Sequence, residues 1–89
     1  MTKRGKLEII KDILLIIKEN NSQIRITPLL RQSNMSSANF KGYYSELLEK
    51  QFIKEISHKE NKFVSLTDKG FRFIEKYKTI VDFIDEFEL

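Results

Sequence analysis

The segment from residue 36 to residue 45 gathers small polar side chains that can form hydrogen bonds with an extended ligand. Asn39 carries a donor and an acceptor side by side, and this pair matches two adjacent polar atoms of an adenine base. The hydroxyls and the ammonium group around it can bind phosphate oxygens. The alternative is that they are ordinary exposed polar side chains. The candidate contacts to nucleic acid are Ser36, Ser37, Asn39, Lys41 and Ser45.

Basic side chains outside this segment are candidate contacts to a phosphate backbone. Arg25 and Arg31 flank an expected short helix and can act as phosphate clamps. Lys59 and Lys62 lie around Glu60 in an expected hairpin tip, and they are candidate contacts to the backbone. The alternative is that this tip is only a solvated turn. The opening segment, residues 2–6, is a short basic arm.

The charge is distributed unevenly along the 89 residues, although the net charge is only +3. Residues 1–66 hold 12 Lys and Arg against 7 Asp and Glu, a net +5. Residues 67–89 hold 4 against 6, a net −2. A positive body can approach a polyanion while a negative tail stays away from it. Chance clustering on a solvated surface is the alternative.

The composition excludes several kinds of site. The chain has no cysteine and one histidine, His58, which leaves no thiol nucleophile and no Cys-ligated metal site. It also lacks a glycine-rich phosphate loop and a base–nucleophile set. We expect no enzyme activity, metal, cofactor or small-molecule ligand. The longest apolar run, residues 13–17, is far too short to cross a membrane, and no signal peptide is evident. We therefore expect a cytoplasmic, nucleoid-associated protein with no membrane partner.

Hydrophobic periodicity predicts the elements that position these residues. Apolar residues at helical spacing give the long helices, and alternation gives the strands. Ser36 is the expected N-cap of the helix that carries Asn39, and Thr27 that of the helix before it. In the helix that carries Asn39, Tyr43 and Tyr44 share the apolar face, which favours core packing of these rings over base stacking. The pattern predicts helices over residues 6–20, 28–32, 37–50 and from 67 or 68 to the end, and strands over 24–26, 52–57 and 62–66.

The order of these elements is that of a winged helix-turn-helix domain. Two helices joined by a tight turn at residues 33–35 precede a two-stranded hairpin, and such domains place the second helix in the DNA major groove. We expect a mostly α (α+β) fold in one compact unit. Residues 1–66 would form the winged-helix DNA-binding domain and residues 67–89 a C-terminal dimerisation helix.

The last helix has an apolar seam whose members step by four and three residues. In a monomer its far half would stand in water, which predicts a homodimer. The alternative is that this helix folds back on the first helix. The expected dimer residues are Phe73, Tyr77, Ile80, Val81, Ile84 and Phe87.

Two stretches carry a family resemblance. The run from Asn34 to Ile53, followed by Val64-Ser65-Leu66-Thr67-Asp68-Lys69-Gly70, resembles small archaeal winged-helix DNA-binding proteins. These include predicted transcriptional regulators and basic chromatin-associated dimers of Sulfolobales. The resemblance covers about residues 6–87. It implies binding of double-stranded DNA by a dimer paired through an antiparallel coiled coil of the last helices. The chain departs from the family at Gln51, where glycine is usual, and carries a glycine, Gly42, inside the recognition helix.

Three functions remain in consideration. The first is a dimeric transcriptional regulator that reads the major groove with residues 37–50 and the backbone with the wing at residues 57–62. The second is a non-specific architectural chromatin protein, which the modest charge disfavours. The third is a winged-helix module that binds another protein.

Overall fold

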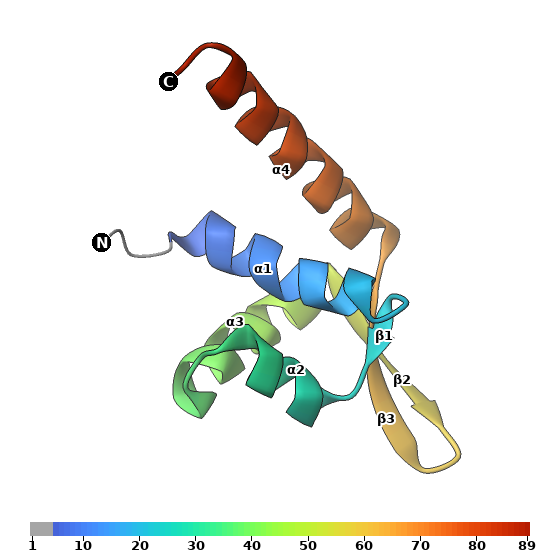
Figure 1. Cartoon of the computed structure of the whole chain (residues 1–89). Helices are drawn as coiled ribbons and strands as arrows, with labels where there is room; N and C mark the ends of the chain where they lie inside the picture. The colour runs from blue at the N-terminus through green and yellow to red at the C-terminus, as the bar shows by residue number, and fades with distance from the viewer. Residues whose placement is uncertain (1–4) are drawn as a thin grey trace.

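The computed structural model describes residues 5–89, which form four helices and a three-stranded antiparallel sheet. This α+β arrangement is the expected winged helix (Figure 1). Residues 2–4 of the basic arm lie outside the described part. The elements are α1 (Lys6–Glu19), β1 (Gln23–Ile24), α2 (Ile26–Ser33), α3 (Ser37–Glu49), β2 (Ile53–His58), β3 (Asn61–Leu66) and α4 (Asp68–Glu86).

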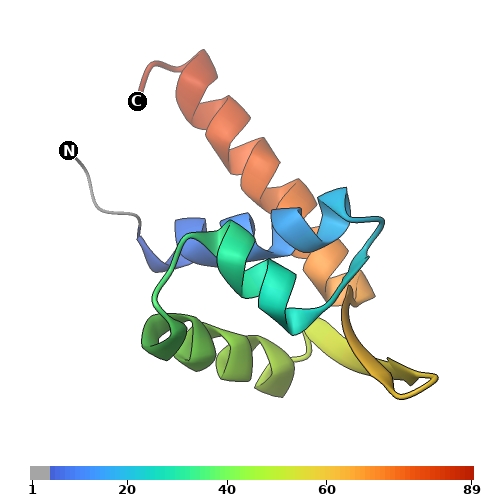
Figure 2. The same ribbon diagram turned by 60° about the horizontal axis from the view of Figure 1, so that its bottom comes forward.

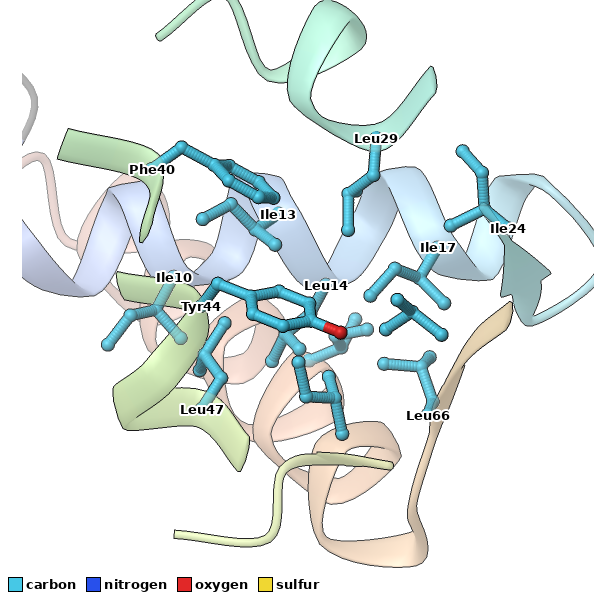
Figure 3. Close-up of a cluster of buried hydrophobic side chains, with 13 residues drawn as sticks. Ile10, Ile13, Leu14, Ile17, Ile24, Leu29, Phe40, Tyr44, Leu47 and Leu66 are labelled. Atoms are coloured by element: carbon cyan, nitrogen blue, oxygen red, sulfur yellow. The ribbon is translucent and has the colours of Figure 1, made fainter. Parts of the chain in front are cut away.

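Helix α1 is the centre of the core. It contacts α2, α4, β1 and β3, as its apolar girth predicts. Ile13, Leu14 and Ile17 are fully buried. Figure 3 shows these side chains meeting Leu29 of α2 and Phe40 of α3. The helix ends where the Asn20 side chain donates to the Ile16 carbonyl at 2.7 Å.

Helix α2 begins earlier than its sequence predicts. Its N-cap is Arg25, and Thr27 and Pro28 are its second and third residues, so the prediction of Thr27 as N-cap is wrong. Pro28 is tolerated because the first N–H groups of a helix have no partner within the helix. The early start of α2 also shortens the predicted strand over residues 24–26, and β1 pairs with β3 through two residues only.

The turn between α2 and α3 is built as the sequence predicts. Asn34 adopts the left-handed conformation with φ 57°. Ser36 then caps α3, and its hydroxyl oxygen accepts from the Asn39 N–H at 3.3 Å. At the other end of α3, Gln51 takes the left-handed φ of 62° that a glycine would adopt without strain.

Strands β2 and β3 form the wing. They pair antiparallel from Ile53 opposite Leu66 to His58 opposite Asn61. The turn therefore consists of Lys59 and Glu60, both with positive φ (47° and 68°). The strands predicted over residues 52–57 and 62–66 would leave residues 58–61 between them, which is two residues too many. Two positive φ values are typical of the tight turns that match strand twist.

Helix α4 begins against the body and then leaves it (Figure 1). Its N-cap Thr67 accepts from the Gly70 N–H at 3.2 Å and donates to the Gln51 carbonyl at 2.6 Å. Ile74 is buried, whereas every residue from Lys78 onward is exposed. The helix ends at Glu86 rather than at the chain end. No helix among residues 5–89 is long and apolar enough to cross a membrane.

Candidate nucleic-acid interface

Helix α3 divides cleanly into a buried stripe and an exposed polar face. Phe40, Tyr44 and Leu47 are buried, and Tyr43 is half-buried against the core. The expected packing of both tyrosines is thereby confirmed. All five candidates of this segment are exposed, namely Ser36, Ser37, Asn39, Lys41 and Ser45. No other side chain of residues 5–89 forms a hydrogen bond with the Asn39 amide, which leaves that amide available to a ligand.

The acidic end of this face is paired with cations. Glu46 accepts a hydrogen bond from Lys6 at 2.9 Å, and Lys50 lies 3.5 Å away. The hydrogen bond from Lys6 holds the pKa of Glu46 below its ordinary value and raises the pKa of Lys6. Sequence reasoning placed Lys6 in a basic arm and missed this pair, because 40 residues separate its members.

A basic cleft lies between the start of α2 and the wing. It brings together Arg25, Arg31 and Lys62, three of the four basic candidates that the sequence places at the expected short helix and the hairpin tip. The Arg25 guanidinium lies over the Phe63 ring, 5.6 Å from its centre, which orients it. Lys59 does not line this cleft and occupies the wing turn instead. The cleft is also lined by residues that the sequence did not identify as contacts to a ligand, namely Ile26, Thr27, Pro28, Glu60 and Asn61.

A hydrogen bond ties α3 to the wing. The Tyr44 hydroxyl donates to the Glu55 carboxylate at 2.6 Å, and the Lys62 ammonium lies 3.8 Å from the same carboxylate. Burial, and then this hydrogen bond, raise the pKa of Tyr44. The link fixes the wing relative to α3. Nothing in the local sequence pattern predicts it, because strand residue 55 could have faced either side.

The candidate elements lie on one side of the molecule. In both ribbon views, α3 and the β2–β3 hairpin lie on the side of α1 away from the free end of α4 (Figures 1 and 2). A rod-shaped ligand can therefore meet α3 and the wing without meeting the acidic end of α4.

The predicted dimer residues fall into two groups. Phe73 and Tyr77 are half-buried within the protomer: Phe73 packs edge-on against Phe52, and Tyr77 lies beneath the Lys11 ammonium. The other four, Ile80, Val81, Ile84 and Phe87, are exposed, as is Phe83 beside them. Between α1 and the middle of α4 runs a groove lined by Lys11, Leu15, Lys18, Ile74, Tyr77, Lys78 and Val81.

Comparison with known proteins identifies similar chains. A sequence profile described as winged helix-turn-helix matches residues 3–85. Curated proteins give no significant match. The fold is similar to that of Sso10a-2, a DNA-binding protein from Sulfolobus solfataricus, with a TM-score of 0.75 and 18% identity over 96% of this chain and 86% of that one.

Two further solved structures come from STIV and SSV1. F93 from STIV, a winged-helix DNA-binding protein, gives a TM-score of 0.74 and 18% identity over 89% of this chain and 91% of its own. SSV1 F-93 gives 0.67 and 26% identity over 96% and 99%. The three TM-scores indicate that these chains share the overall fold of this one.

Proposed function

Because the chain belongs to the winged helix-turn-helix family, we propose that it binds double-stranded DNA as a homodimer and acts as a transcriptional regulator. Helix α3 enters the major groove, and the wing contacts the backbone. The observation that carries this proposal is the exposed face of α3, which is small and polar at its N-terminal half. Two of the similar structures are described as DNA-binding proteins, which agrees with it.

On α3, each polar side chain has a distinct partner in this arrangement. Asn39 pairs with an adenine edge through its unoccupied amide. Ser36 uses its oxygen as the helix cap, and its O–H donates to a phosphate. Ser37 and Ser45 reach phosphate or base atoms, and Lys41 binds a phosphate at the flank.

The basic cleft binds the backbone beside the groove. Two guanidinium groups, from Arg25 and Arg31, and the Lys62 ammonium surround the first turn of α2. Of the first three residues of α2, Ile26 and Thr27 carry N–H groups that have no partner within the helix and favour anions, whereas Pro28 has no N–H group. A phosphate held here fixes the register of α3 in the groove, and Lys59 contacts the next part of the backbone from the wing turn.

Dimerisation covers the exposed end of α4. Ile80 and Phe87 are each 58% exposed, and Phe83 is 54% exposed, an apolar surface that a second copy would bury. The charges of α4 favour an antiparallel pair. Residues 68–78 hold four basic and two acidic side chains, whereas residues 79–89 hold four acidic and none basic. Antiparallel packing sets the acidic half of one helix beside the basic half of the other, and parallel packing would set acid against acid.

The groove between α1 and α4 accommodates the partner's helix end. Three lysines, Lys11, Lys18 and Lys78, line it together with apolar side chains. The end of α4 offers the complementary chemistry, because its residues 82–88 alternate acids with Phe83, Ile84 and Phe87. The dimer proposed here is therefore a coiled coil extended by a contact to α1 of the partner.

One observation favours a second candidate function. Glu46 and Glu49 lie on the C-terminal half of the α3 face, and carboxylates repel phosphate. A winged-helix module that binds a basic protein surface would use this half. Salt dependence distinguishes the two candidates, because DNA binding releases counterions from the duplex.

The test is a titration of a fluorescent duplex at salt concentrations from about 50 to about 200 mM. If three cleft cations per protomer each neutralise a phosphate, the dimer should give a slope of about −5 in a plot of log affinity against log salt. Arg31→Ala should weaken binding to every duplex and reduce the slope by about 2. Lys54→Ala, which removes an exposed charge near the start of β2 outside the cleft, is the control and should leave the slope unchanged. Absence of duplex binding at low salt would reject the proposal in favour of the protein module.

A further inference from the structure

Gly42 lies in the middle of α3, where glycine is unfavourable. Only proline is a poorer helix former, and alanine would be the better residue. The fold gives no reason for glycine here, because a Cβ built at position 42 would meet nothing within 4 Å. Gly70 differs, since a Cβ there would collide with the Phe52 carbonyl. The packing of this chain explains Gly70 and leaves Gly42 unexplained.

The absent side chain leaves a shallow hollow on the exposed face of α3. Gly42 lies about 180° around the helix from the buried stripe of Phe40, Tyr44 and Leu47, at 100° per residue. Its neighbours one turn away on the same face are Ala38 and Glu46. The hollow is lined by Lys6, Ala38, Asn39, Gly42, Tyr43 and Glu46.

The lining selects the kind of group that fits. Ala38 and Gly42 are exposed, and the Gly42 Cα and the Ala38 methyl are the apolar groups of the lining. Among residues 5–89, the hollow offers a phosphate no free cation, because Lys6, the one basic residue in its lining, is paired with Glu46 at 2.9 Å. A base edge is favoured, because the Asn39 amide lines it too and has no partner within residues 5–89. The apolar group that the major groove presents is the 5-methyl of thymine.

We propose that the hollow over Gly42 receives a thymine 5-methyl group while Asn39 pairs with an adenine beside it. This inference rests on the proposed function and adds to it which bases α3 reads. Glycine is then kept because the base edge occupies the space that a Cβ would fill. The pair of Lys6 and Glu46, at 2.9 Å, fixes the carboxylate at the side of the hollow and leaves neither charge free for a phosphate.

The test begins with duplexes selected by the wild-type protein from a random pool. Gly42→Ala should raise the melting temperature by about 4–8 °C, as a better helix former does in a domain of this size, and weaken binding to the selected duplex by about tenfold. Uracil in place of the contacted thymine removes only the methyl group and should weaken wild-type binding about fourfold. The same replacement should leave the binding of Gly42→Ala unchanged.

Thr79→Ala is the matched control for added helix propensity. Thr79 lies on α4, far along the chain from α3, and its hydroxyl donates only to the Glu75 carbonyl of its own helix, so duplex affinity should not change. The inference is overturned if Gly42→Ala binds the selected duplex as tightly as wild type, if no single uracil weakens binding, or if the pool yields no preferred sequence. Duplex binding by the dimer survives those three results, although a pool without a preferred sequence would favour the non-specific architectural role over the regulator. Duplex binding itself is rejected if the wild-type protein binds no duplex at low salt.

Discussion

Replacing Ile80 by alanine tests the dimer quantitatively, because the exposed fraction of this side chain sets how much of it a partner can cover. Removing its three outer carbons from a fully buried site costs about 2.4 kcal/mol, at about 0.8 per methylene. Ile80 is 58% exposed in the protomer, so pairing buries only that share, about 1.4 kcal/mol. A two-fold dimer loses this amount twice, which weakens association about 100-fold.

Sedimentation equilibrium measures this dissociation constant directly. Ile80→Ala should shift it about 100-fold, whereas Thr79→Ala, about 100° around α4 from Ile80 and outside the apolar seam, should leave it unchanged. The free energy of unfolding of the separated protomer should change little, because Ile80 does not belong to the core. A monomeric wild-type protein at micromolar concentration, or an Ile80→Ala dimer as tight as wild type, would refute the reasoning.

Three other substitutions test separate parts of the account. Tyr44→Phe should lower the free energy of unfolding by about 1.5 kcal/mol, because it removes the hydroxyl that donates to Glu55. Folding raises the pKa of Tyr44 above the ordinary tyrosine value of 10.0, so the wild-type protein should also lose stability as the pH rises above 10.0. Urea unfolding at increasing pH should show this loss in the wild-type protein and in the control Tyr43→Phe, but not in Tyr44→Phe. Thr67→Val removes the N-cap of α4 and the hydrogen bond to the Gln51 carbonyl. It should lower the free energy of unfolding by about 1–2 kcal/mol in the same assay, with Thr79→Val as the control. Asn39→Ala should change which duplexes are selected, whereas Lys41→Ala should weaken all of them alike; equal loss on every sequence for Asn39→Ala would contradict base reading.

The local elements could be predicted because their signals are local. The spacing of Phe40, Tyr44 and Leu47 and the cap at Ser36 define α3, and the structure places that helix within one residue of the prediction. The start of α2 was misplaced by the assumption that Pro28 takes the first helical position. Any position in the first turn satisfies the same requirement, because none of those N–H groups has a helical partner.

The contacts between distant segments could not be predicted in this way. Tyr44 meets Glu55 and Lys6 meets Glu46 only after the chain has folded. The cleft that gathers Arg25, Arg31 and Lys62 depends on the same packing. Residue types identified these side chains as candidates, but which of them lie together is decided by how α2 and the wing meet on α1 and the sheet.

The most direct measurement of the central claim is a titration of isotope-labelled protein with a duplex, followed through backbone amide chemical shifts. The account predicts that the largest shifts fall on residues 36–45, on Arg25 and Arg31, and on the wing turn and the first residues of β3, residues 59–62. Shifts confined to α4 or to the groove between α1 and α4, with α3 unaffected, would contradict it.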